Sequence, residues 1–199
     1  MNLLNTRSQY GAVSWTLHWI IVLALLIQWL LSEADKDAVP VPGIQLNALT
    51  LHQSLGLAVL LLAIVRLAWR FFNPKPAWPA DMKTYEITLA RTVHFAFYFL
   101  LFAIPLTGWA LSSVEDEPMR FFNWFDVPRV ALANEDSLEE THEILFNILA
   151  ALALLHVLGA TKHWIVSRRA SSSPRPVPHQ ARRPNRLEAA PITSADTVE

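Results

Sequence analysis

Four long apolar stretches, separated by polar connections, restrict what this chain of 199 residues can fold into. About 20 residues of helix are enough to cross the hydrocarbon core of a bilayer, and each stretch approaches or exceeds that length. Hydrophobic residues make up 53% of the chain and charged residues only 17%, which is more apolar than an ordinary soluble domain. We therefore expect an all-α, integral membrane four-helix bundle with helices over 14–32, 51–72, 92–114 and 141–166.

The basic residues predict how this bundle is oriented. Of the 16 Lys and Arg residues, only Lys36, Arg120 and Arg129 lie in the connections after the first and third helices. Cytoplasmic flanks carry the excess of positive charge in membrane proteins, so both termini are expected in the cytoplasm. The opposite face is acidic. Its carboxylates are Glu33, Asp35, Asp37, Glu115, Asp116, Glu117, Asp126, Glu135, Asp136, Glu139 and Glu140.

Composition divides the chain into three parts. Residues 1–13 are expected to form a cytoplasmic N-terminal segment, and residues 14–167 form the membrane domain. From residue 168 to 199 the chain is rich in Pro and Ser and has hardly any large apolar residue. Such a composition cannot bury a core, so it predicts a disordered cytoplasmic tail.

The connection before the fourth helix holds an unusual aromatic segment. Residues 118–130 read PMRFFNWFDVPRV, which mixes four aromatic residues with scattered charges. This pattern fits a short stretch lying along the outer membrane interface. An ordinary apolar loop packed over the helix ends is an equal alternative.

Histidines occur inside the apolar stretches, where their polar nitrogens need partners. They are His18, His52, His94, His142 and His156. Several imidazoles in one small membrane protein suggest a bound group, and haem iron is the favoured one. The chain has no Cys, so iron–sulfur clusters held by thiolates and covalent C-x-x-C-H haem attachment are excluded.

The spacing of the histidines predicts two haem sites at two depths. His142 and His156 are 14 residues apart, which places them on nearly the same helix face and about 21 Å apart along the axis. Each needs a second imidazole at its own depth. In the predicted topology His52 lies level with His142, and His18 lies level with His156.

Two further features near these histidines each allow two interpretations. Gly56 and Gly159 follow His52 and His156 by about one turn, where a missing side chain would admit a flat porphyrin or allow close helix packing. Arg66 occurs near the cytoplasmic end of the second helix. It would pair with haem propionates or serve as an ordinary positive-inside anchor.

These sequence patterns resemble the prokaryotic cytochrome b561 family. The resemblance rests on SWTLHW, LHQSLG with VRLAWR, HFAFYFLLFAIPLTG, ETHEILFN and LLHVLGATKHW, and it extends over nearly all of residues 10–167. It implies a bacterial inner-membrane cytochrome with two b-type haems. The implied axial ligands are His18 and His156 on the cytoplasmic side, and His52 and His142 on the outer side.

The resemblance also implies an activity, because some family members are superoxide oxidases that reduce ubiquinone. His94 would then be a group at a haem edge or quinone site rather than an axial ligand. His163 follows His156 by seven residues, about 10.5 Å nearer the cytoplasm, and is expected to supply protons to a quinone. An interfacial histidine beside Lys162 and Trp164 is the alternative.

The acidic outer face conflicts with superoxide as the donor, because it would repel an anion. The same acidity would suit a basic redox protein, so two functions remain open. One is a superoxide-oxidising, quinone-reducing enzyme, and the other is an electron-transfer cytochrome serving a separate dehydrogenase or periplasmic partner. A haem-free transporter with histidine proton relays explains the paired depths less well. Membrane lipid is an expected partner, and nucleic acid is not.

Overall fold

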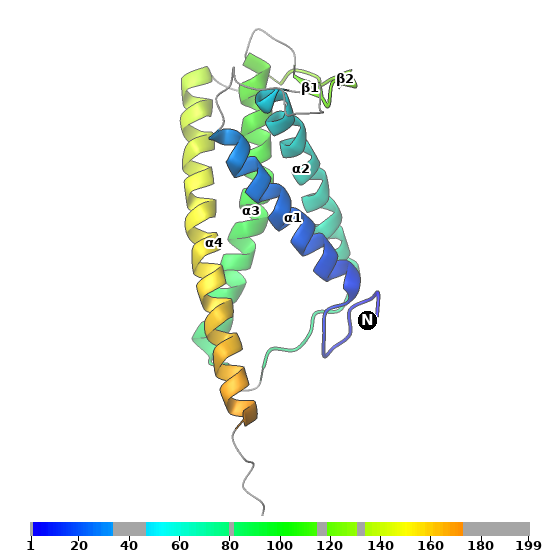
Figure 1. Cartoon of the computed structure of the whole chain (residues 1–199), viewed down its shortest axis with the longest axis vertical. Helices are drawn as coiled ribbons and strands as arrows, with labels where there is room; N and C mark the ends of the chain where they lie inside the picture. The colour runs from blue at the N-terminus through cyan, green and yellow to red at the C-terminus, as the bar shows by residue number, and fades with distance from the viewer. Residues whose placement is uncertain (1, 34–46, 80–81, 115–118, 131–133, 173–199) are drawn as a thin grey trace, which may run out of the picture. The chain divides into compact units, whose positions relative to one another are not determined.

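The structure is a computed structural model that describes residues 2–33, 47–79, 82–114, 119–130 and 134–172. Within these residues, four long helices and one short hairpin are present (Figure 1). The elements are α1 (Ala12–Ser32), α2 (Ala48–Phe72), α3 (Thr84–Val114), β1 (Arg120–Phe121), β2 (Phe125–Asp126) and α4 (Glu135–Ser172). All four helices are long and apolar enough to cross a membrane, which confirms the predicted helical membrane fold.

The helices extend beyond the apolar stretches that predicted them. Helix α3 begins at Thr84 rather than residue 92, and α4 spans Glu135–Ser172 rather than 141–166. A polar turn outside the hydrocarbon still satisfies its backbone as helix, so hydropathy alone underestimates helix length. Residues 168–172, where the sequence predicts the start of a disordered tail, are therefore helical. Residues 173–199 lie outside the described residues.

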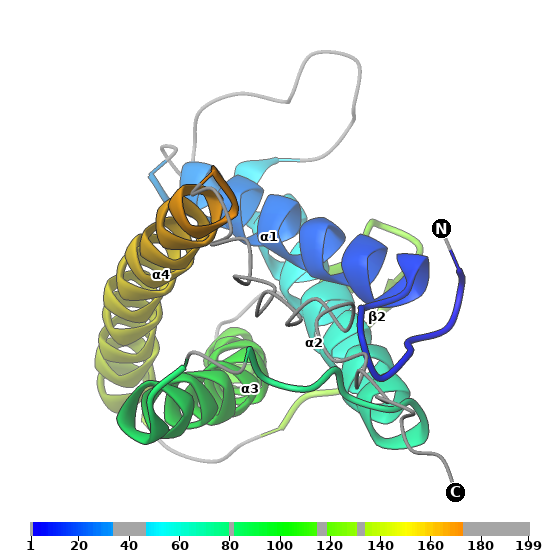
Figure 2. The ribbon, with the colours of Figure 1, turned by 90° about the horizontal axis from the view of Figure 1, so that it is seen from below.

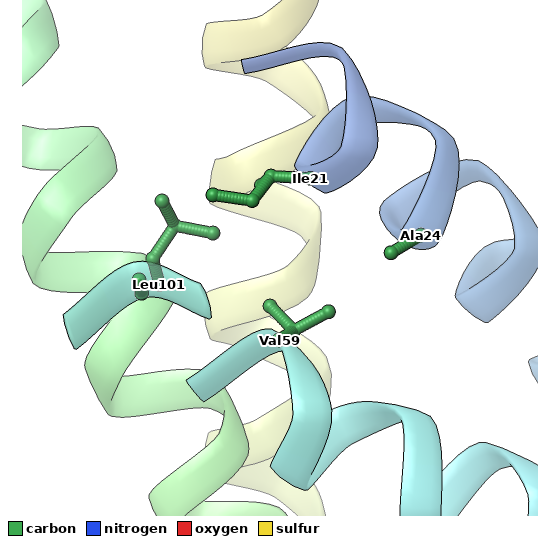
Figure 3. Packing of buried hydrophobic residues seen from close by; sticks show 5 residues of the cluster. Ile21, Ala24, Val59 and Leu101 are labelled. Carbon is green, nitrogen blue, oxygen red and sulfur yellow. The ribbon is translucent and has the colours of Figure 1, made fainter. Parts of the chain in front are cut away.

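Two compact units make up the chain, Met1–Gly159 and Ala160–Glu199, and the packing described below belongs to the first. Helix α2 packs against both α1 and α3 (Figure 2). The buried centre of this contact consists of Ile21, Ala24, Val59, Ala63 and Leu101 (Figure 3). Small residues let membrane helices approach closely, because van der Waals contact is the main force available in lipid.

The outer surfaces of the helices are strongly apolar. Leu61 on α2, Phe95 on α3 and Leu155 on α4 are 62%, 75% and 60% exposed, and many other large apolar side chains are similarly exposed. A water-soluble protein rarely leaves so many large apolar side chains uncovered. Lipid is the solvent that fits this surface, as the composition predicts.

The N-terminal segment is tied to the connection between α2 and α3. The Asn5 side chain donates to the Pro74 carbonyl at 3.1 Å and accepts from the Gly11 amide at 2.9 Å and the Ser14 hydroxyl at 2.7 Å. A Cβ at Gly11 would overlap the carbonyl groups of Leu3 and Leu4, so only glycine permits this close approach. Residues 2–11 and the start of the α2–α3 connection therefore meet at one end of the bundle.

The aromatic segment folds as a hairpin held on α2. Phe122 and Asn123 have φ values of 48° and 60°, and the Trp124 amide donates to the Phe121 carbonyl at 2.9 Å, which defines a type I′ turn. The buried Ser54 hydroxyl accepts from the Phe122 amide at 2.8 Å. Trp124 is 78% exposed, so the segment combines features of both sequence interpretations: it packs over a helix end and still displays aromatic surface.

Candidate functional site

The structure brings His52 of α2 and His142 of α4 together. Their ring centroids are 6.4 Å apart and their planes are inclined by 67°. A metal held by two imidazole nitrogens at about 2 Å each gives ring centres about 6 Å apart, since each centre lies about 1 Å beyond its nitrogen. The observed separation therefore matches two axial ligands on one metal.

His18 of α1 and His156 of α4 form a second pair with nearly the same geometry. Their centroids are also 6.4 Å apart, with planes inclined by 73°. The four rings are half-buried in the bundle. The pairs that the helix spacing predicts are thus the pairs that lie together, and their role as haem ligands stays a prediction.

His94 of α3 also lies beside the second pair. Its ring centroid is 5.8 Å from that of His156, which is closer than His18, and Phe97 contacts the same ring edge-on at 5.4 Å. Three rings therefore surround His156. Only one of them can stand opposite it across a metal, so His94 is a neighbour of this pair and a competitor of His18.

A threonine of α3 lies within hydrogen-bonding distance of the His142 ring. The Thr107 hydroxyl lies 3.1 Å from His142 Nδ1, and it also lies 3.0 Å from the Ala103 carbonyl and 2.9 Å from the Ile104 carbonyl. A hydroxyl has one proton, and when Thr107 donates it to one of these carbonyls, its oxygen accepts from His142 Nδ1–H. In that tautomer the proton is on Nδ1 and the Nε2 lone pair is available to a metal.

Gly108 gives the His142 ring its space. A Cβ at this position would lie 3.0 Å from His142 Cε1, which is tighter than ordinary packing allows. The sequence alone does not predict a role for Thr107 or Gly108 at this site. The two residues are adjacent in α3, but this spacing alone does not indicate a histidine neighbour. Their contacts with His142 depend on how α3 packs against α4.

The residues fit haem better than a bare metal ion. Among the described residues, no three His, Asp or Glu side chains are grouped so that they could hold a metal ion. A bare ion such as zinc needs about four protein ligands, whereas haem iron receives four nitrogens from the porphyrin and needs only axial ligands. Paired imidazoles meet this requirement.

Two arginines of α2 lie near these histidines, Arg66 beside His18 and His156 and Arg70 beside His94. Arg66 is half-buried and lies within electrostatic range of His18 and His156. The guanidinium of Arg70 lies over the Tyr98 ring, with its central carbon 5.4 Å from the ring centroid, so a cation–π contact occupies it. Arg66 is therefore the better placed of the two for the carboxylates of a bound group.

The positions of Gly56, Gly159 and His163 give less information about a bound group. A Cβ at Gly56 would lie 3.1 Å from the Gln28 amide nitrogen of α1, which matches the helix-packing interpretation of this glycine. A Cβ at Gly159 would meet nothing within 4 Å. His163 lies half-buried in α4, within the unit that begins at Ala160, and its role stays a prediction from spacing.

Comparison with known proteins defines the class of this chain. A sequence profile described as prokaryotic cytochrome b561 matches residues 9–173. "Cytochrome b561 homolog 2" of Escherichia coli strain K12 is 31% identical over 176 residues, which cover 84% of this chain and 91% of that protein. "Probable superoxide oxidase CybB" of Yersinia pestis is 26% identical over 163 residues, covering 80% of this chain and 91% of its own length.

The chain therefore belongs to the prokaryotic cytochrome b561 family, as the sequence motifs predict. It is a multi-pass inner-membrane electron-transfer protein of a family that binds b-type haem.

Proposed function

We propose that this protein is a diheme cytochrome b that carries electrons from the periplasmic side of the membrane to ubiquinone, with superoxide as the donor. The observation that carries the proposal is the presence of two histidine pairs with the same 6.4 Å centroid separation, at two levels of one helix. When bound, haem supplies an iron that takes up and releases one electron at a time.

The chain's own residues have defined roles in this proposal. His52 and His142 hold the periplasmic haem, and His18 and His156 hold the cytoplasmic one. Thr107 keeps the proton of His142 on Nδ1. This orientation places both termini in the cytoplasm, in agreement with the distribution of Lys and Arg.

Two residues are proposed to serve the cytoplasmic side. Arg66 offers its positive charge to haem propionates, because it lies within electrostatic range of both His18 and His156. His163 is proposed as a proton donor to the quinone, on the strength of its spacing from His156. A quinone that accepts two electrons also needs two protons, and histidine is the side chain suited to supply them near neutral pH.

A second function is favoured by the charge of the periplasmic face. Arg120, one of three cations predicted there, is paired with Asp126 at 2.9 Å across the hairpin. Lys36 lies outside the described residues. An acidic face suits a basic electron donor, which favours a cytochrome that serves a periplasmic redox partner or a separate dehydrogenase.

A pyridine haemochrome assay with protein quantification tests the core of the proposal. We expect two b-type haems per chain in the native protein. His52→Ala should remove one haem, and His18→Ala should remove the other, each leaving the remaining haem spectrally intact. Loss of both haems from either inserted, folded single variant would contradict the pairing, and one haem or none in the native protein would contradict the proposal itself.

A further inference from the structure

Two buried polar atoms remain unpaired where α1 meets the start of α2. They are Oε1 of Gln28 and Nδ1 of His52, and they are the buried side-chain atoms without a hydrogen-bond partner among the described residues. Leaving either atom unsatisfied in a membrane interior is costly, because no water replaces the missing bond. Such a pair of atoms calls for a common explanation.

The two atoms belong to neighbouring side chains. The Gln28 amide nitrogen would lie 3.1 Å from a Cβ on Gly56, so the amide rests against the turn of α2 that follows His52. Gly56 is four residues after His52, which puts both on the same helix face. Gln28 is also the one amide side chain of α1, a helix without charged residues, and this side chain contacts the turn of α2 that contains Gly56.

The atoms are chemically complementary. A carbonyl oxygen accepts a hydrogen bond, and the Nδ1 of a histidine that binds metal through Nε2 donates one. His142, across the pair, already has such an acceptor in Thr107 at 3.1 Å. His52 Nδ1 has no such partner, although the backbone carbonyl of Gln28 lies beside the His52 ring, and the Gln28 side chain carries an unused acceptor.

We infer that Gln28 is the positioning residue for His52, with its side-chain carbonyl accepting a hydrogen bond from His52 Nδ1–H when Nε2 binds the haem iron. The last torsion of a glutamine side chain is soft, so the amide turns between Gly56 and His52 at little cost. Gln28 then fixes the tautomer and ring orientation of His52, as Thr107 does for His142. The inference rests on the proposed ligation by His52.

The expected consequences concern the haem held by His52 and not the other one. An acceptor on Nδ1–H increases the basicity of the ligating nitrogen and stabilises ferric iron. Gln28→Leu should therefore raise the midpoint potential of this haem and make its loss to a haem-scavenging protein about tenfold faster or more. Gln28→Glu, a stronger acceptor, should shift the potential in the opposite direction.

Redox titration and electron paramagnetic resonance of the purified, haem-loaded protein test this inference. Gln53→Leu is the matched control, because it removes the same amide one residue from His52, about 100° around the helix. Gly56→Ala is an independent variant that crowds the Gln28 amide without altering it, so it should shift the same haem in the same direction as Gln28→Leu. The haem of His18 and His156 serves as the internal reference.

The outcomes separate this inference from the function on which it rests. Native protein without a haem at His52 would contradict the proposed function. Native protein with both haems, and a Gln28→Leu variant whose potentials, spectrum and haem-loss rate match those of Gln53→Leu, would overturn the role of Gln28 alone. If Gln28→Leu fails to insert, the same comparison is made with Gly56→Ala, where an unchanged haem is equally decisive.

Discussion

At the scale of single residues, the chemistry of this site depends on which histidine stands opposite which. The imidazole rings of His18 and His156 have the same centroid separation as those of His52 and His142, and their planes are similarly inclined. His94 departs from this shared geometry, because its centroid lies 5.8 Å from that of His156. Two sites that perform the same task in one bundle are expected to be built alike, so His18 is the better partner of His156.

This argument predicts different effects for two neighbouring histidines. His94→Ala should retain two haems and a low-spin, six-coordinate spectrum, whereas His18→Ala should lose the cytoplasmic haem. Visible and electron paramagnetic resonance spectra of the two variants provide the comparison. A His18→Ala protein that stays six-coordinate, together with a His94→Ala protein that does not, would exchange the roles assigned to these residues.

A second prediction at this scale concerns His163. If it supplies protons to the quinone, His163→Gln should slow quinol formation several-fold and leave reduction of the periplasmic haem unchanged, because glutamine keeps a polar side chain but cannot titrate. Stopped-flow spectroscopy separates the two steps. Equal slowing of both steps, or no effect on either, would remove His163 from the proposed mechanism.

At the scale of elements, the turn of the hairpin that precedes α4 is hydrogen-bonded to a serine of α2. Ser54 is fully buried, donates to the Thr50 carbonyl at 2.7 Å and accepts from the Phe122 amide at 2.8 Å. Phe122 lies in the left-handed region that bulky residues avoid, at a cost of about 1–3 kcal/mol. The bond from Ser54 helps to keep the turn in this conformation.

Ser54→Ala should therefore loosen the hairpin without removing either haem. It leaves the Phe122 amide unpaired, which costs about 1–3 kcal/mol for a buried donor. Hydrogen exchange over residues 119–127 should become faster in the variant. Ser32→Ala is the control, since the Ser32 hydroxyl is exposed at the end of α1 and donates to the Trp29 carbonyl of its own helix at 2.7 Å. Unchanged exchange in Ser54→Ala would show that the hairpin is held by other contacts.

The elements also show what the sequence could and could not predict. Apolar length predicted four spanning helices, and helical spacing predicted which histidines lie at the same depth, because both follow from distances along one helix. The hairpin was missed because its turn contains Phe122 and Asn123 instead of the Asn-Gly pattern that usually marks a type I′ turn. The contacts of Gln28 with Gly56 and of Gly108 with His142 depend on how two helices pack, which no single helix pattern specifies.

At the scale of the whole molecule, charge decides which donors reach the periplasmic face. The connections on that face are rich in Asp and Glu, although Glu115, Asp116 and Glu117 lie outside the described residues. Arg120 contributes little net attraction for an anion, because Asp126 compensates it and both side chains are more than half exposed. Long-range attraction or repulsion at such a surface weakens as salt is added, since the screening length falls to about 10 Å at 0.1 M.

The salt dependence of haem reduction therefore identifies the donor. If superoxide is the donor and must approach an acidic face, added salt should screen the repulsion and speed reduction. A cationic redox protein should instead be slowed, because salt weakens its attraction to the same face. Stopped-flow reduction of the haems in reconstituted vesicles, over a salt series with each donor, makes the comparison. Slower reduction by superoxide at higher salt would reveal a basic local approach path, and no reduction by superoxide at any salt concentration would exclude the oxidase function and leave electron transfer from a protein partner.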